Sequence, residues 1–142
     1  MGDLSGFVGK WQEKEKRGFD DMAKKLGLNE VRTEMYKKTE TVIEYKQNGD
    51  KWVMEVGILA GPPPTSYTFK LGEPYDSKDI DESPMKSLVK SNGNTFEEEH
   101  TFEDGPMKNN KMDIKREIEN EQMKVTTTLG DCSFETTYAK VK

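Results

Sequence analysis

Residues 111–129 read KMDIKREIENEQMKVTTTL, and this stretch decides the fold. On both sides of Asn120-Glu121, apolar residues alternate with polar ones, a period of two that predicts strands with one dry and one wet face. The apolar positions of the dry face are Met112, Ile114, Ile118, Met123, Val125 and Leu129. Two such runs on either side of a short turn predict an antiparallel hairpin.

The same period continues over most of the chain after Thr39. Further alternating apolar sets are Trp52, Met54, Val56 and Ile58, and Tyr67, Phe69 and Leu71. Asn48-Gly49 and Asn92-Gly93 predict type I′ turns, in which both central residues have positive φ. Pro62-Pro63-Pro64 predicts a loop, because proline cannot donate to a strand ladder. Weaker turn signals occur at Asp104-Gly105 and Gly130-Asp131. The pattern favours an antiparallel meander that forms a sandwich or closes on itself.

A helical period precedes the strands. Residues 19–26 carry apolar side chains at i, i+3, i+4 and i+7, which places them on one helical face. These residues are Phe19, Met22, Ala23 and Leu26. Gly27 suits the left-handed residue that ends a helix, and Asn29 suits the N-cap of a second helix with Val31 and Met35 on one side. A helix-turn-helix of about twenty residues is predicted.

Length and charge limit the classes of protein to consider. The 142 residues suit a single domain over residues 1–142. The net charge of −5 and pI near 5.1 argue against nucleic-acid binding, which needs a clustered positive field. No apolar run has the length of a membrane span, and the N-terminus lacks the features of a secretory signal. Cys132 is the only cysteine, so we expect a protein of the reducing cytoplasm.

Several polar residues fall on the dry face of the predicted strands. Alternation places Arg116 with Ile114 and Ile118, and it places Thr136 and Tyr138 together on the last strand. The strand between Phe96 and Phe102 brings two more, Glu98 and His100, to the interior. A solid core does not tolerate so many polar groups, whereas a water-containing cavity with a polar ligand head group does. We therefore expect a hollow interior.

Each of these residues also has a structural explanation. Arg116 can pair with Glu98 across the neighbouring hairpin or lie at a wet strand end, and His100 can be a hydrogen-bonded wall residue. Cys132 is expected to be a small buried hydrophobe, since no motif supports a nucleophilic pair with His100. The Glu97-Glu98-Glu99-His100 run is not a metal site, because adjacent residues on a strand point to opposite faces.

The chain resembles the intracellular lipid-binding proteins, the family of cytosolic fatty-acid-binding and cellular retinoid-binding proteins. The resemblance covers nearly the whole chain and rests on the order of several short motifs. They are Phe7-Val8-Gly9-Lys10-Trp11, Gly18-Phe19-Asp20-Asp21, Leu26-Gly27, Phe69-Lys70-Leu71-Gly72, Met85-Lys86-Ser87-Leu88-Val89, Arg116-Glu117 and Thr137-Tyr138. The resemblance implies an all-β fold, a ten-stranded antiparallel up-and-down β-barrel (β-clam) of two near-orthogonal sheets, capped by a short helix-turn-helix that forms a ligand portal.

The resemblance also implies how a fatty-acid carboxylate is bound. In such proteins an arginine on the eighth strand and an Arg-x-Tyr pair on the tenth hold it. Arg116 matches the first arginine and Tyr138 the tyrosine, but Thr136 stands where the second arginine would be. With one cation absent and Glu98 near the other, capture of a carboxylate is an open question. The portal turn with its three prolines and the hairpin at residues 105–110 are both longer than usual.

These observations favour a non-catalytic carrier of a long-chain fatty acid or similar hydrophobic ligand, with no cofactor and no metal. A carrier of a neutral or weakly polar ligand such as a retinoid is the alternative, favoured by Thr136. An enzyme using His100, Cys132 and Glu98, or an interaction module with a vestigial cavity, are weaker hypotheses. The candidate ligand-binding residues are Arg116, Tyr138, Thr136, Glu98, His100, Phe19, Met22, Met35, Met54 and Ile58.

The helical cap has its own predicted role. We expect Phe19, Met22, Leu26 and Met35 to line its inner side over the barrel mouth. Basic residues surround this cap in an otherwise acidic, monomeric protein, and they are Lys24, Lys25, Arg32, Lys37 and Lys38. They predict either transient contact with anionic membranes or an ordinary solvated helix surface.

Overall fold

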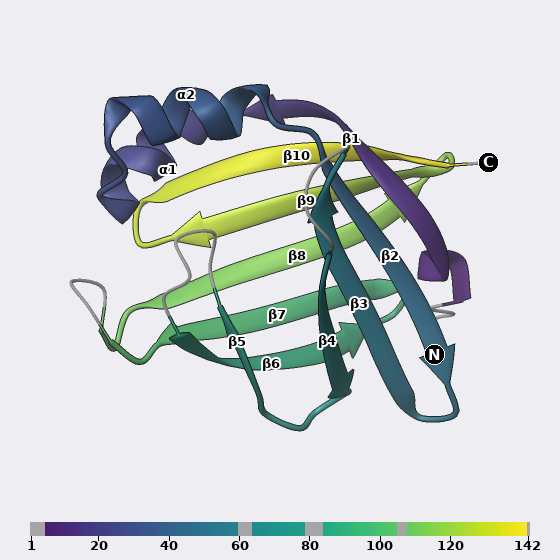
Figure 1. Ribbon diagram of the computed structural model, residues 1–142. Helices are drawn as coiled ribbons and strands as arrows, with labels where there is room; N and C mark the ends of the chain where they lie inside the picture. The colour runs from purple at the N-terminus through teal and green to yellow at the C-terminus, as the bar shows by residue number, and fades with distance from the viewer. Residues whose placement is uncertain (1–4, 60–63, 79–83, 105–107, 142) are drawn as a thin grey trace.

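Ten antiparallel strands curve into a nearly closed barrel in the computed structural model, which describes residues 5–59, 64–78, 84–104 and 108–141 (Figure 1). The strand order is β4-β3-β2-β1-β10-β9-β8-β7-β6-β5, so β1 pairs with β10 and the edges are β4 and β5. The strands are β1 Gly9–Arg17, β2 Thr41–Asn48, β3 Lys51–Ile58, β4 Thr65–Lys70, β5 Tyr75–Lys78, β6 Pro84–Asn92, β7 Thr95–Phe102, β8 Lys111–Glu119, β9 Gln122–Leu129 and β10 Cys132–Lys140. A 3₁₀ turn, Ser5–Phe7, precedes β1. The predicted ten-stranded β-clam is confirmed.

The two predicted helices cover one end of the barrel (Figure 1). Helix α1, Phe19–Leu26, packs against β10, and α2, Glu30–Lys38, follows it directly. Gly27 ends α1 with φ of 79°, and the Asn29 side chain accepts a hydrogen bond of 2.8 Å from the Arg32 N–H at the start of α2. Both predicted helix signals are thus confirmed. Within the described residues no helix is long and apolar enough to cross a membrane.

The hairpin turns differ from the prediction in type. Only the first central residue has positive φ in the turns after β2 and β6, where Gly49 has φ of 65° and Gly93 has φ of 67°. This is the pattern of type II′ rather than type I′, since the strands extend one residue further than expected. Both central residues have positive φ at Asn120-Glu121, the turn between β8 and β9. Of the predicted loop residues, Pro62, Pro63 and Gly105 lie outside the described residues.

Alternation sorts the inward side chains into two apolar clusters. The first cluster centres on Phe7, Trp11, Ile43, Tyr45, Trp52, Met54, Phe69, Val89, Phe96, Met123, Val125 and Tyr138. The second, beneath α1, contains Met22, Met85, Phe102, Met112 and Leu129. The dry faces predicted for β8 and β9 are confirmed by this arrangement, because their alternate residues are the ones that reach the clusters.

Candidate functional site

A belt of buried polar residues lies between the two apolar clusters, beside Ile114, which packs against both. On β6 the inward residues run Met85, Ser87, Val89, from the second cluster to the first. On β7 the polar residues His100 and Glu98 lie between Phe102 of the second cluster and Phe96 of the first. Thr127 on β9 and Thr136 on β10 occupy the same level between apolar neighbours. We call Ser77, Ser87, Glu98, His100, Arg116, Thr127 and Thr136 the polar belt.

Short hydrogen bonds link five members of the belt in a continuous chain. The Ser77 and Ser87 hydroxyl oxygens are 2.5 Å apart, and Ser87 Oγ lies 2.6 Å from His100 Nδ1. His100 Nε2 lies 2.8 Å from Glu98 Oε1. Arg116 Nε donates to the second oxygen, Glu98 Oε2, at 2.5 Å. The chain crosses from β5 to β8 and gives each of these five buried side chains a hydrogen-bond partner, as buried groups require.

The Glu98–Arg116 pair is ionised although it is buried. Burial opposes the charge on Glu98, but the Arg116 guanidinium and the His100 hydrogen bond outweigh that effect and lower the carboxyl pKa to about 2. Burial likewise opposes the charge on Arg116, and Glu98 more than compensates and raises the guanidinium pKa. The two charges cancel each other inside the barrel at neutral pH.

Two tyrosine hydroxyls near this pair remain unpaired. Tyr45 Oη and Tyr75 Oη are buried and make no hydrogen bond of good geometry among the described residues, although Ser87 is near enough to Tyr75 to offset slightly the rise in its pKa that burial causes. Burial raises the pKa of both phenols, and both also respond to the charges of Arg116 and Glu98. The hydroxyls therefore stay protonated, close to the ion pair and available as donors.

Most predicted site residues are buried, either inside the barrel or on the inner side of α1. These are Arg116, Tyr138, Thr136, Glu98, His100, Phe19, Met22 and Met54. Met35 and Ile58 differ from the prediction, with 51% and 42% of their surface exposed. None of the residues of α2 is buried, so Met35 does not line the inner side of the cap, and Ile58 is the last residue of β3. The side chain of Leu26 lies outside the described residues.

The catalytic pair considered from the sequence is not formed. Both ring nitrogens of His100 are engaged, one by Ser87 and the other by Glu98. Cys132 is partly buried, and its sulfur lies 3.7 Å from the Asp131 carboxylate. No ring nitrogen of His100 is left to activate the thiol.

Five residues of the site were missed by the sequence reasoning, namely Tyr45, Tyr75, Ser77, Ser87 and Thr127. For three of them a signal was present. Thr127 alternates with Val125 and Leu129, which places it on the dry face. Ser87 alternates with Met85 and Val89, and Tyr45 alternates with Ile43, so the period of two places both on the dry face. Strand β5 has four residues, too few for a period to indicate the orientation of Tyr75 and Ser77.

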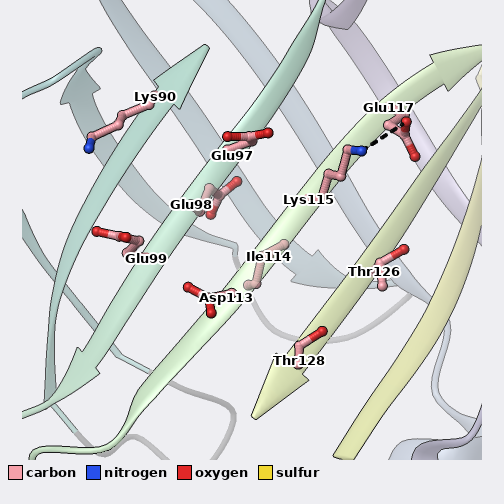
Figure 2. A pocket seen from close by; sticks show the side chains of 10 residues that line it. All are labelled: Lys90, Glu97, Glu98, Glu99, Asp113, Ile114, Lys115, Glu117, Thr126 and Thr128. Carbon is pink, nitrogen blue, oxygen red and sulfur yellow. Dashed lines mark ion pairs between the residues drawn. The ribbon is translucent and has the colours of Figure 1, made fainter. Parts of the chain in front are cut away.

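A depression of about 460 Å³ lies on the other side of the sheet, over β6 to β9. Figure 2 shows its lining side chains, among them Lys90, Glu97 and the Lys115–Glu117 ion pair of 3.5 Å. Apart from Glu98 and Ile114, the lining residues occupy outward positions of their strands. This charged, open surface does not suit an apolar ligand. The hollow interior stays a prediction.

The chain matches no family model, but it is similar to several proteins that bind lipids. A 14 kDa fatty acid-binding protein of Schistosoma mansoni is 30% identical over 138 residues, which cover 97% of this chain and 99% of that protein. Cellular retinoic acid-binding protein 2 of Mus musculus is 27% identical over 133 residues, covering 90% and 92%. The structure of the Schistosoma mansoni fatty acid-binding protein in complex with arachidonic acid superposes with a TM-score of 0.86 at 29% identity, over 99% of this chain and all of that one.

Proposed function

This chain belongs to the intracellular lipid-binding protein family, which includes fatty acid-binding and cellular retinoic acid-binding proteins, and we propose that it binds and transports a long-chain fatty acid or similar hydrophobic ligand inside its barrel. The observation that carries the proposal is the polar belt between two apolar clusters. An amphipathic molecule needs both surfaces, an apolar one for its chain and a polar one for its head group.

The energetics of such a ligand favour tight binding without catalysis. Burial of the hydrocarbon chain supplies about 0.8 kcal/mol per CH₂ before the costs of ordering are subtracted. The belt then orients the head group rather than supplying most of the affinity. The relatives are named as binding proteins, in agreement with a non-catalytic role, and with a single cysteine the cytoplasm is the proposed location. We take the working form to be a monomer.

Native mass spectrometry of the delipidated protein with oleate tests the proposal. One oleate per chain is expected. Thr127→Phe fills the belt from inside the barrel and should weaken binding at least tenfold, whereas Thr128→Phe on the wet side of the same strand should leave it unchanged. Urea unfolding of both variants checks that each remains folded. Absence of saturable binding of oleate and of its methyl ester by the parent would contradict the proposal.

A neutral or weakly polar ligand is the second candidate. Thr136 is buried at a position where a cationic side chain would strengthen the binding of a carboxylate. The Arg116 guanidinium is already hydrogen-bonded to Glu98. Both features reduce the positive charge that an anionic head group meets.

We further propose that the helical cap touches anionic membranes during ligand transfer. Val31 and Met35 are exposed on α2, at i and i+4, so both lie on one side of the helix. Arg32 and Lys38 lie three residues before and after Met35, beside this apolar pair on the helix. Other basic residues of the cap form ion pairs, Lys37 with Asp20 and Glu34 and Lys25 with Asp131. An exposed apolar pair with a basic border suits the headgroup region of a bilayer.

A further inference from the structure

The unpaired phenols are held rigidly by aromatic packing. The Tyr45 ring lies 5.6 Å from Phe96, Phe96 lies 6.2 Å from Phe69, and Phe69 stacks on Tyr75 at 5.5 Å between ring centroids. One continuous set of rings therefore positions both hydroxyls. A buried hydroxyl without a partner is unfavourable, so each of these two groups, joined by the same set of rings, indicates a position that a bound polar group completes.

The charges beside the phenols do not favour an anion. Glu98 already accepts from Arg116, and its second oxygen is bonded to His100. A ligand carboxylate placed here would meet the Glu98 carboxylate at close range, in surroundings of low dielectric where like charges repel strongly. The neighbouring belt residues Thr127 and Thr136 are neutral. Donor hydroxyls are present, but no uncompensated cation accompanies them in the described belt.

We infer that the site takes a long-chain lipid with an uncharged head group, an ester or amide of a fatty acid, whose carbonyl oxygen accepts hydrogen bonds from Tyr45 and Tyr75. A carbonyl oxygen has two lone pairs and matches two donors. The inference rests on the proposed function and specifies its ligand class. It makes Tyr45 and Tyr75 the head-group residues and gives the Glu98–Arg116 pair the role of weakening the binding of free acids relative to their esters and amides.

Affinities for oleate and methyl oleate at neutral pH test the inference. The parent should bind methyl oleate at least tenfold more tightly than oleate. Tyr45→Phe and Tyr75→Phe should each weaken methyl oleate binding by about threefold to tenfold, as loss of one hydrogen bond predicts, without changing oleate binding. Tyr36→Phe removes a phenol on α2, outside the barrel, and serves as the matched control.

Glu98→Gln gives an independent readout. It releases Arg116 as a free cation, so the ratio of oleate to methyl oleate affinity should rise at least tenfold. The inference would be overturned if the parent bound oleate more tightly than methyl oleate and the tyrosine variants changed neither affinity. The carrier function would still stand. If neither ligand bound at all, the carrier function would fail and the inference with it.

Discussion

Glu98 on β7 binds Arg116 on β8 diagonally, because the residue directly opposite Glu98 is Ile114 and the residue opposite Arg116 is Phe96. Diagonal neighbours on one face of a sheet lie within reach of long side chains. The pair therefore forms without any distortion of the ladder, and both charges stay inside the barrel.

Arg116→Leu should lower the free energy of unfolding of the ligand-free protein by about 3–5 kcal/mol, because it leaves the Glu98 carboxylate buried and unpaired. The double variant Arg116→Leu/Glu98→Leu should recover most of that loss. Urea denaturation of the four proteins in this cycle measures the coupling. Lys111→Leu, which breaks the exposed pair with Glu99, is the control and should cost less than about 1 kcal/mol. A loss in the double variant equal to the sum of the losses in Arg116→Leu and Glu98→Leu would show that the pair is not coupled.

The Glu98–Arg116 ion pair should make the free energy of unfolding depend on pH. The carboxyl of Glu98 has a pKa of about 2 when folded and an ordinary value of 4.5, so it stabilises the fold above pH 4.5 and loses that contribution as pH falls through about 2. The contribution is on the order of 3 kcal/mol. Parent and Glu98→Gln should therefore differ most near neutral pH and converge in acid, as followed by urea unfolding. Glu99→Gln, on the wet face of the same strand, should show no such convergence.

Truncation of two methionines of the helical cap should lower the free energy of unfolding by very different amounts. Met22→Ala should cost about 2–5 kcal/mol of unfolding free energy, because the side chain is fully buried against the second apolar cluster. Met35→Ala should cost less than about 0.5 kcal/mol, since half of its surface is exposed on α2. Thermal or urea unfolding compares the two. A large loss for Met35→Ala would place that residue inside the cap after all.

Lysines of the cap should govern transfer to membranes. Replacing Lys24, Lys25, Lys37 and Lys38 with glutamine should slow transfer of a fluorescent fatty acid to anionic vesicles and weaken its dependence on salt. Glutamine at four exposed lysines of the strands, Lys51, Lys90, Lys111 and Lys115, gives the same change in net charge away from the cap. Similar rates for the two variants would assign the cap lysines to an ordinary solvated surface.

For the longer strands, the sequence alone determined which residues face inward. Arg116, Glu98 and Thr136 were placed inside by their position between apolar residues, and the structure buries all three. Alternation is a local property of extended backbone, so it can be read without knowing which strands are neighbours. The same holds for α1, whose face, end and following N-cap depend only on residues within one or two turns.

Tertiary structure alone decided which inward residues meet. The Glu98–Arg116 contact depends on the register of β7 and β8, which a hairpin of unknown geometry leaves open by a residue or two. Tyr45 on β2 and Tyr75 on β5 approach Arg116 because β1 pairs with β10 and the sheet closes, bringing together segments far apart in the chain. Met35 is exposed because the packing of α1 on β10 sets where the cap rests, and no helical period contains that information.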